Sequence, residues 1–315
     1  MPDSPLRRHW IRRLQIGLLG ALVLVVPLAS VAGYNYAKGR LAALEYLREN
    51  PQAQIDVAPV RYWPATIPQP AWLQSIKGIE LPSGKCDVRR FVALHELREL
   101  KCRRCEIDRE GLSSLSAFTR LERLRLVDCQ ISDDDLAVLR KCPRLLDLDL
   151  SSNALTDNGL RAIADLPLVE LRIADNRITD AGLYHLADLP LKALSLSKTD
   201  VSDGGLADIA MFAPLTLLEL HGTKITDAGL RHLTRLPLKG LDVSRTRVTD
   251  AGMPELTLMP LTFVNLAEDD ITSKAVPHLE LIPKLSIVTL SRPPFNKDNT
   301  QMLSARGVLV KFADR

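Results

Sequence analysis

The sequence predicts an α/β solenoid of about ten strand-turn-helix units, and two observations support this. Leucines recur in one column every 23 or 24 residues, and each opens the same pattern, seen as Leu215-x-x-Leu218-x-Leu220. The column contains Leu97, Leu121, Leu145, Leu168, Leu191, Leu215, Leu238, Leu261 and Leu285, and Ile76 extends it toward the N-terminus. A fixed period of this length indicates stacked units, because one unit alone cannot bury its hydrophobic surface.

Each unit divides into a strand, a turn and a short helix. In residues 215–237, Leu218 and Leu220 alternate as a strand's period of two requires. Thr226 suits the N-cap of a helix, and Asp227 favours the positive end of the helix dipole. The apolar side of the helix follows, and Pro237 ends it. We therefore expect a parallel sheet along one side of the solenoid and helices along the other.

A second column holds small or polar residues at the bend after each strand. We expect these side chains to point inward and to satisfy backbone groups that would otherwise be buried without hydrogen bonds. The column consists of Cys105, Cys129, Asn153, Asn176, Thr199, Thr223, Thr246 and Asp269. We call it the ladder.

The composition is that of a globular chain, with 46% hydrophobic residues, 25% charged residues and a formal net charge of +3. This near balance of charge gives no indication of nucleic-acid binding. The repeats predict one elongated domain over residues 72–315.

The N-terminal region predicts a membrane anchor. Residues 1–13 are short and basic, and residues 14–33 carry no charge. Twenty apolar residues match the roughly 30 Å hydrocarbon thickness of a bilayer. The flanking arginines favour a cytoplasmic N-terminus, which places the repeats outside the cytoplasmic membrane. A cleaved signal peptide, with small residues at Ser30-Val31-Ala32, and a twin-arginine export signal remain as alternatives.

The two ends of the repeat domain are irregular. Residues 34–71 predict a juxtamembrane helix followed by a proline-rich linker or cap, and we expect Trp63 and Trp72 to cover the open first repeat. At the other end, Val308–Phe312 predicts a last strand that protects the edge of the sheet.

Several residues suggest chemistry but fit the repeat pattern better. Cys102 and Cys105 have the C-x-x-C spacing of redox or zinc sites, yet they occupy inward positions, so we expect buried structural cysteines with a disulfide or a metal as the alternative. His185, His232 and His278 share one helix column, which favours a solvated surface. The sequence predicts no catalytic residue, no cofactor and no metal site. Acidic candidates such as Asp180, Asp227 and Asp250 are helix-start residues.

The recurring Ile/Val-Thr/Ser-Asp-x-Gly-Leu motif at residues 178–183, 201–206 and 225–230, and with Met at 248–253, resembles the cysteine-containing class of leucine-rich repeat. That class is familiar from F-box substrate receptors and from bacterial membrane-anchored proteins, and the layout of this chain is more similar to the bacterial group. The resemblance implies a horseshoe with a concave parallel sheet and a recognition role. It implies no ligase-adaptor function, because no F-box-like module precedes the repeats.

The concave sheet is where we expect a partner, another protein, to bind. Its outward positions are dense in both charges in the first half, with basic residues concentrated toward the N-terminal end. The second half exposes apolar side chains beside polar ones. The predicted partner-binding residues are Leu217, Glu219, His221, Asp242, Phe263 and Ile287. The sequence therefore predicts an anchored, non-enzymatic recognition module, with a secreted scaffold and an enzyme or enzyme regulator as alternatives.

Overall fold

The computed structural model describes residues 41–47, 49–50, 52–58, 75–212, 214–292 and 294–314. The basic N-terminus, the anchor predicted at residues 14–33, and Trp63 and Trp72 lie outside these residues. Within the described ranges, no helix has both the length and the apolar character needed to cross a bilayer. The described residues form two compact units: unit 1 contains those up to residue 124 and residues 141–144, and unit 2 contains those of 125–140 and from 145 onward.

In the described part of unit 1, residues 41–47 are helical and short, irregular elements follow. Its strands are β1 (Gln54–Ala58), β2 (Ser75–Leu81), β3 (Gly84–Lys85), β4 (Glu99–Arg103) and β5 (Cys105–Glu106). Its helices are the 3-10 helices η2 (Val88–Phe91) and η3 (Ser114–Ala117) and the α-helix α3 (Arg109–Ser113). Strand β6 (Arg123–Val127) carries residues of both units.

The edge of the sheet in unit 1 is covered by a strand that the repeat pattern does not contain. β1 pairs antiparallel with β2, whereas β2 pairs parallel with β4 in the manner of the repeats. The residues of β1 were expected to belong to a proline-rich linker or cap, not to a strand. An added antiparallel strand satisfies the backbone groups of β2 that would otherwise lie at an open edge.

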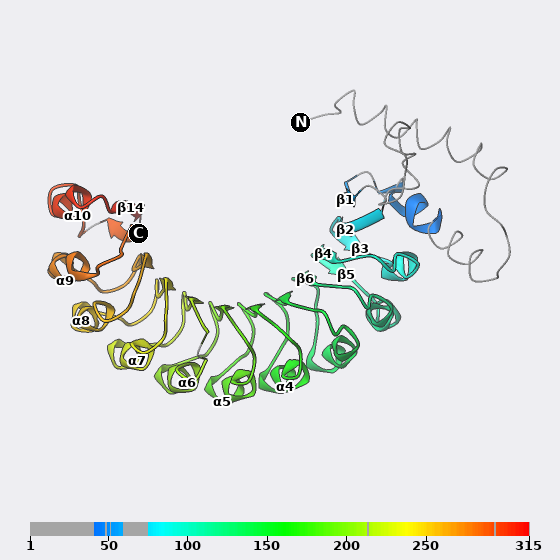
Figure 1. The fold of residues 1–315 in the computed structure, drawn as a ribbon, viewed down its shortest axis with the longest axis horizontal. Coiled ribbons are helices and arrows are strands. Elements are labelled where there is room, and N and C mark those ends of the chain that lie inside the picture. The colour runs from blue at the N-terminus through cyan, green and yellow to red at the C-terminus, as the bar shows by residue number, and fades with distance from the viewer. Residues whose placement is uncertain are drawn as a thin grey trace, which may run out of the picture. The chain divides into compact units, whose positions relative to one another are not determined.

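Unit 2 repeats strand and helix with little variation (Figure 1). Its strands are β7 (Asp147–Asp149), β8 (Glu170–Arg172), β9 (Ala193–Ser195), β10 (Leu217–Glu219), β11 (Gly240–Asp242), β12 (Phe263–Asn265), β13 (Ile287–Arg292) and β14 (Leu309–Asp314). Its α-helices are α4 (Asp157–Ile163), α5 (Asp180–Leu183), α6 (Asp203–Ile209), α7 (Asp227–Leu233), α8 (Met253–Leu256), α9 (Val276–Leu281) and α10 (Gln301–Ala305). The 3-10 helices are η4 (Asp133–Lys141), η5 (Tyr184–Leu186), η6 (Asp250–Gly252) and η7 (Ser273–Ala275).

In unit 2 the strands lie side by side along the inner side of an arc, and the helices lie along the outer side (Figure 1). Neighbouring strands from β7 to β14 are parallel and in register. The leucine column is buried between the two layers, with Leu215, Leu238 and Leu261 fully inaccessible to solvent. The last strand, predicted at 308–312, is confirmed as β14, which pairs with β13.

Most consecutive repeats of unit 2 are joined by an aspartate at the start of a helix. Asp157 accepts hydrogen bonds from the backbone N–H of Thr179 at 2.8 Å and from its hydroxyl at 2.6 Å. The same contact recurs in Asp133–Thr156, Asp157–Thr179, Asp180–Ser202, Asp203–Thr226, Asp227–Thr249 and Asp250–Thr272. We call these contacts the inter-repeat ties. The interpretation of these aspartates as helix-dipole partners alone was therefore incomplete.

The glycine of the motif makes room for this tie. A Cβ atom placed on Gly182 would lie 2.5 Å from Oδ1 of Asp157, the oxygen that accepts the Thr179 N–H. The corresponding glycines 159, 205, 229 and 252 face the aspartate of the preceding repeat in the same way. The Thr-Asp-x-Gly spacing thus encodes contact with the neighbouring repeat as well as a helix start.

Candidate functional site

The candidate site is a row of apolar residues on the inner side of unit 2. Strand register aligns Leu217 with Gly240, Gly240 with Phe263, and Phe263 with Ile287. Ala193 extends the row on one side and Leu309 on the other. Adjacent positions are therefore about 4.8 Å apart, the spacing of neighbouring strands. We call Ala193, Leu217, Gly240, Phe263, Ile287 and Leu309 the apolar row.

The side chains of the apolar row are less exposed to solvent than the sequence predicts. Leu217, Phe263 and Ile287 were expected to be exposed, but each is half-buried. A Cβ atom added at Gly240 would lie 2.7 Å from Cδ1 of Leu217 and 3.8 Å from Cδ1 of Phe263. The side chain of Leu217 therefore occupies the space over this glycine.

Leu309 is a member of this row that sequence reasoning missed. It is 55% exposed and pairs in register with Ile287. Residues 308–312 were expected only to protect the sheet edge. The signal was present, since Leu309 follows Ile287 by nearly one repeat length, but it becomes informative only once β14 is known to continue the parallel register.

A polar row borders the apolar row. Asp242 accepts hydrogen bonds from the backbone N–H of Ser244 at 2.9 Å, from its hydroxyl at 2.5 Å, and from Nδ2 of Asn265 at 2.9 Å. Nδ1 of His221 lies 2.9 Å from the Ser244 hydroxyl oxygen. The half-buried Glu219 is the neighbour of Asp242 in the sheet. Of the predicted polar residues, the structure therefore joins His221 and Asp242 through Ser244.

The His221–Ser244–Asp242 cluster has the wrong order for a nucleophilic relay. In such a relay the imidazole stands between the serine hydroxyl and the carboxylate. Here the serine stands in the middle, with its hydroxyl on Asp242 and its oxygen beside His221. Ser244 is also buried. The cluster therefore fixes the orientation of the polar row and does not prepare a serine for attack.

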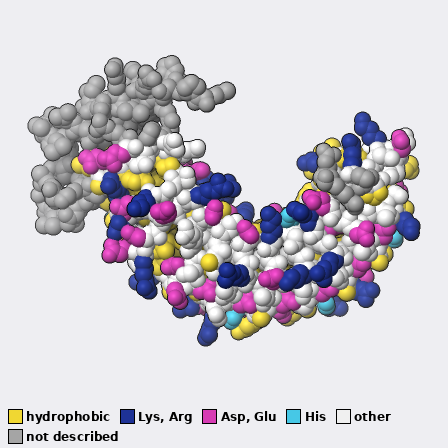
Figure 2. All heavy atoms as spheres, turned by 180° about the vertical axis from the view of Figure 1, so that it is seen from behind, with side chains coloured by type: hydrophobic (Ala, Val, Ile, Leu, Met, Phe, Trp, Pro, Cys, Tyr) yellow, Lys and Arg dark blue, Asp and Glu magenta, His cyan; other side chains and the backbone are white. Residues whose placement is uncertain are grey.

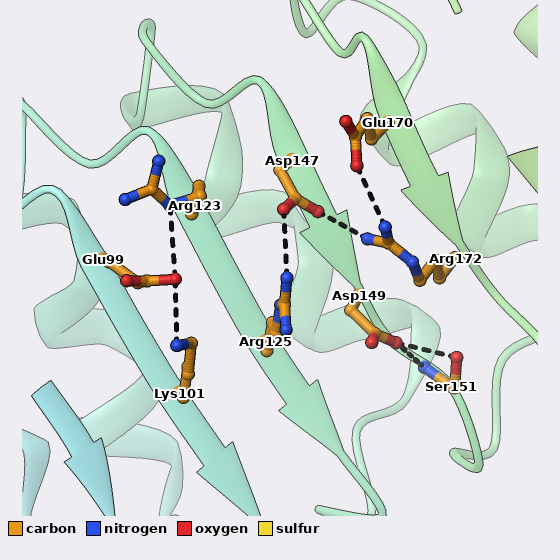
Figure 3. Close-up of polar contacts among 9 residues, drawn as sticks. All are labelled: Glu99, Lys101, Arg123, Arg125, Asp147, Asp149, Ser151, Glu170 and Arg172. Atoms are coloured by element: carbon orange, nitrogen blue, oxygen red, sulfur yellow. Dashed lines mark hydrogen bonds and ion pairs between the residues drawn. The ribbon is translucent and has the colours of Figure 1, made fainter. Parts of the chain in front are cut away.

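The charged outward positions of unit 1 are engaged in ion pairs (Figure 3). The carboxylate of Glu99 lies 3.2 Å from Nζ of Lys101 and 3.2 Å from Nε of Arg123. Burial opposes ionisation of Glu99, but these two cations outweigh it and lower its pKa. Arg98 pairs with Glu122 at 2.7 Å. Much of the positive charge predicted for this end of the sheet is therefore balanced by neighbouring carboxylates.

Unit 2 has a second ion-pair network at its first strands (Figure 3). Asp147 lies 2.8 Å from Arg172 and 3.4 Å from Arg125, and Arg172 also contacts Glu170 at 2.9 Å. Burial disfavours the charge on Arg172, but Asp147 and Glu170 outweigh it, and the pKa of the guanidinium is raised. Oppositely charged residues on neighbouring strands are therefore paired laterally on this part of the sheet.

The ladder residues lie at the bends. Oδ1 of Asn153 accepts hydrogen bonds from the backbone N–H groups of Cys129 and Ile131, both at 3.0 Å. Its Nδ2 donates to the carbonyls of Leu126 and Leu150 at 2.7 and 2.8 Å. Oδ1 of Asn176 accepts from the N–H of Leu155, and its Nδ2 donates to the carbonyls of Leu150 and Ile173, all at 3.0 Å. Each asparagine therefore bonds both its own repeat and the preceding one.

The later ladder residues make fewer contacts. Thr199 and Thr223 donate only to a carbonyl of their own repeat, at 2.6 and 2.7 Å. Asp269 accepts from the backbone N–H of Thr246 at 2.6 Å and from its hydroxyl at 3.2 Å. Burial, partly offset by these donors and reinforced by Asp242 and Glu268, raises the pKa of Asp269 to about 7.

The cysteines and histidines take different positions. Cys86, Cys102, Cys105, Cys129 and Cys142 are all buried, and none is in a disulfide. His185 is half-buried against the Tyr184 ring, while His232 is exposed. No group of three or more histidine, cysteine or acidic side chains in the described residues is arranged to hold a metal ion.

Comparison with known proteins agrees with this geometry. A sequence model described as a leucine-rich repeat matches residues 141–164 and 167–187. The crystal structure of an internalin (InlF) from Listeria monocytogenes superposes with a TM-score of 0.53 and 20% identity, covering 72% of this chain and 70% of that one. Internalin C2 of the same organism gives a TM-score of 0.48 at 20% identity, covering 66% and 84%.

A PEPR1–AtPEP1 structure gives a TM-score of 0.46 at 18% identity, and this chain covers 42% of its length. No curated protein sequence gives a significant match. The repeat period, the parallel sheet, the sequence model and the InlF superposition together show that the repeats of this chain have the leucine-rich repeat fold.

Proposed function

We propose that this chain is a membrane-anchored, non-enzymatic recognition module that binds another protein on the inner side of unit 2. The observation that carries the proposal is the apolar row beside the polar row of Glu219, Asp242 and Asn265. Apolar side chains bordered by polar ones are the usual composition of a protein-binding patch.

Electrostatics favour this part of the sheet over its more charged beginning. At the beginning of unit 2, Asp147 and Arg172 already satisfy each other, so a partner would have to break these ion pairs. Over the visible face of unit 2, basic and acidic side chains intermingle rather than forming one field (Figure 2). Such a mixture supports contact with a protein better than contact with a nucleic-acid backbone.

The localisation in this proposal rests on the sequence. Residues 14–33 would hold the chain in the bilayer, with the N-terminus in the cytoplasm and the repeats outside. The alternative is a secreted or periplasmic protein after cleavage of these residues. Protease added to cells whose wall has been opened should digest the repeats and spare an N-terminal tag. Repeats recovered in the soluble fraction at reduced mass would show cleavage instead.

The binding proposal is tested by capture from envelope extract with the full chain as bait. The double change Leu217→Asp and Phe263→Asp places two charges in the apolar row and should abolish capture of the partner. The matched control is Met211→Asp with Leu258→Asp, because these residues are 72% and 65% exposed and lie outside the row. The control should capture as well as the unmodified chain.

Thermal unfolding of the same proteins separates binding from stability. Lost capture with a nearly unchanged unfolding midpoint supports the proposal. A large fall in the midpoint would show that the half-buried row belongs to the core, and Gly240→Ala, which displaces only Leu217, would then replace the double change. Capture that survives in the folded double variant would contradict the proposal and place the binding surface elsewhere.

A further inference from the structure

The thiols of Cys86 and Cys105 lie against each other in unit 1. Sγ of Cys86 donates to Sγ of Cys105 at 2.9 Å. Both residues are buried, with exposed fractions of 5% and 1%. A disulfide bond is about 2.05 Å long, so the two sulfurs need to approach by only about 0.9 Å to form one.

The repeat geometry explains why these side chains meet. Oδ1 of Asn153 reaches the N–H of Ile131, and Oδ1 of Asn176 reaches the N–H of Leu155, both at 3.0 Å. A ladder side chain therefore lies beside the residue two positions after the ladder position of the preceding repeat. Cys105 is a ladder residue, and Gly84 pairs with it and holds the ladder position of the preceding repeat. The residue two positions after Gly84 is Cys86, so its side chain lies beside that of Cys105.

The sequence departs from its own pattern at Cys86. The equivalent position holds an aliphatic residue in the next eight repeats and Phe295 in the last; the aliphatic residues are Ile107, Ile131, Leu155, Ile178, Val201, Ile225, Val248 and Ile271. Cysteine stands at this position only in the repeat whose neighbour carries Cys105. A small buried hydrophobe would explain one cysteine, but it does not explain two at adjoining positions.

The surroundings hold both sulfurs together. Each thiol also lies 3.3 Å from the same acceptor, the carbonyl oxygen of Pro82. The Tyr46 ring packs edge-on against Phe91 at 5.3 Å. Burial, and then the neighbouring Cys86, raises the pKa of Tyr46 to about 12, so its hydroxyl stays neutral beside the sulfur pair. Both cysteines are therefore positioned by groups from several segments of unit 1.

We infer that Cys86 and Cys105 form a disulfide that locks the first repeat of unit 1 when the chain meets a disulfide oxidant. The Cys86 thiolate attacks one sulfur of the oxidant's disulfide and expels a thiolate. Cys105, as its thiolate, then attacks Cys86 in the mixed disulfide and expels the second one. Two protein S–H bonds are lost, one S–S bond forms, and the oxidant leaves as two thiols.

The test is refolding of the detergent-solubilised full chain in a mixture of reduced and oxidised glutathione. Refolding gives the oxidant access to thiols that are buried in the folded state. After alkylation of remaining thiols and digestion, mass spectrometry should find a peptide that joins Cys86 to Cys105 and weighs two hydrogen atoms less than its parts. Adding a reductant should then lower the unfolding midpoint of the chain by roughly 5–10 °C.

Matched variants identify the bond. Cys86→Ala and Cys105→Ala should each remove the linked peptide and the effect of the reductant. Cys102→Ala and Cys142→Ala, which remove other buried thiols of unit 1, should keep both. A peptide joining Cys102 to Cys105 would overturn the inference in favour of the C-x-x-C pair. Complete alkylation of Cys86 and Cys105 after refolding would overturn it outright.

Discussion

Asp108 in unit 1 and Asp157 in unit 2 occupy neighbouring positions of the repeat pattern. The difference of one position changes which groups donate hydrogen bonds to the carboxylate. Asp108 is the N-cap residue of α3 and accepts from the N–H of Gly111 in its own helix. Asp157 is the first residue of α4, and it accepts from Thr179 in the next repeat. At the position equivalent to Asp157, unit 1 has Arg109.

The two regions therefore use similar residues for different purposes. A local cap stabilises one helix, whereas an inter-repeat tie couples the folding of two repeats. Unit 2 carries a series of such ties, while the repeat that contains α3 in unit 1 has its own cap and meets the preceding repeat through the exposed ion pair Arg89–Glu110. The following predictions test whether contacts between repeats cost more to remove than contacts within one repeat.

The largest effect is expected in the ladder. Asn153→Leu removes hydrogen bonds to Cys129 and Ile131 in the preceding repeat and leaves their N–H groups without an acceptor. The free energy of unfolding should fall by about 3 kcal/mol, because each buried polar group left unsatisfied costs about 1–3 kcal/mol. Thr223→Val loses one bond within its own repeat and should cost about 1 kcal/mol. Equal decreases in the free energy of unfolding of the two variants, measured with urea, would show that contacts between repeats cost no more to remove than contacts within one repeat.

Asp269 is a ladder residue whose contact with the preceding repeat depends on pH. Its folded-state pKa of about 7 lies above the ordinary value of 3.8, so the folded chain binds this proton more tightly than the unfolded chain does. The associated stability is present at low pH and is lost as pH rises through about 7. Asp269→Asn should therefore stabilise the protein by about 2 kcal/mol at pH 8 relative to the unmodified chain.

Near pH 4 the gain from Asp269→Asn should nearly vanish, because the aspartate is then protonated in the folded state. Urea unfolding at both pH values measures the difference. A gain that is the same at both would show that hydrogen bonding, and not the charge of Asp269, sets its cost.

The inter-repeat tie itself should have a moderate effect, because this contact is partly exposed. Asp157→Ala removes both hydrogen bonds to Thr179 and should lower the free energy of unfolding by about 1–2 kcal/mol. Asp165→Ala, an exposed aspartate of the same repeat, is the control and should change it little.

Gly182→Ala checks the space that the tie requires. Alone it should destabilise, because the new Cβ meets the carboxylate of Asp157. Combined with Asp157→Ala it should cost less than the sum of the single changes, since the obstructing group is gone. Strict additivity in this cycle would contradict the proposed role of the glycine.

The smallest effect on stability is expected at the repeat position where the backbone has a left-handed conformation in both units. Arg104 in unit 1 and Lys198 in unit 2 have φ values of 55° and 56°, and glycine occupies this position only at Gly222. Lys198→Gly should be neutral or stabilising by up to about 0.5 kcal/mol, because relief of the unfavourable φ is offset by the entropy of a more flexible unfolded chain. Lys239→Gly, outside that region, should destabilise in the same thermal measurement.

The repeat pattern predicted the structure within each single repeat. Leu218 and Leu220 are buried as their alternation requires, and the helix begins at the expected threonine. It could not predict β1, because Gln54–Ala58 contains no copy of the repeat and its antiparallel pairing depends on a distant strand. Long-range pairings of this kind leave no periodic signal in a sequence.

The candidate site was predicted in position but not in detail. Alternation along each strand located Leu217, Phe263 and Ile287 in one row, as the register shows. The position of the Leu217 side chain over Gly240 depends on its rotamer, which no pattern of residue types specifies. Likewise, Ser244 between His221 and Asp242 depends on side-chain directions that only the folded chain reveals.

The inter-repeat ties also bear on how such a chain changes its length in evolution. Every tie joins the same two positions of adjoining repeats, so whole repeats are interchangeable at their junctions. Loss of residues 179–201 would bring Ser202 to the place of Thr179, opposite the carboxylate of Asp157. A chain with that deletion should still unfold in a single transition. Gene duplication or deletion in steps of one repeat is therefore compatible with the fold, whereas a gain or loss of part of a repeat is not.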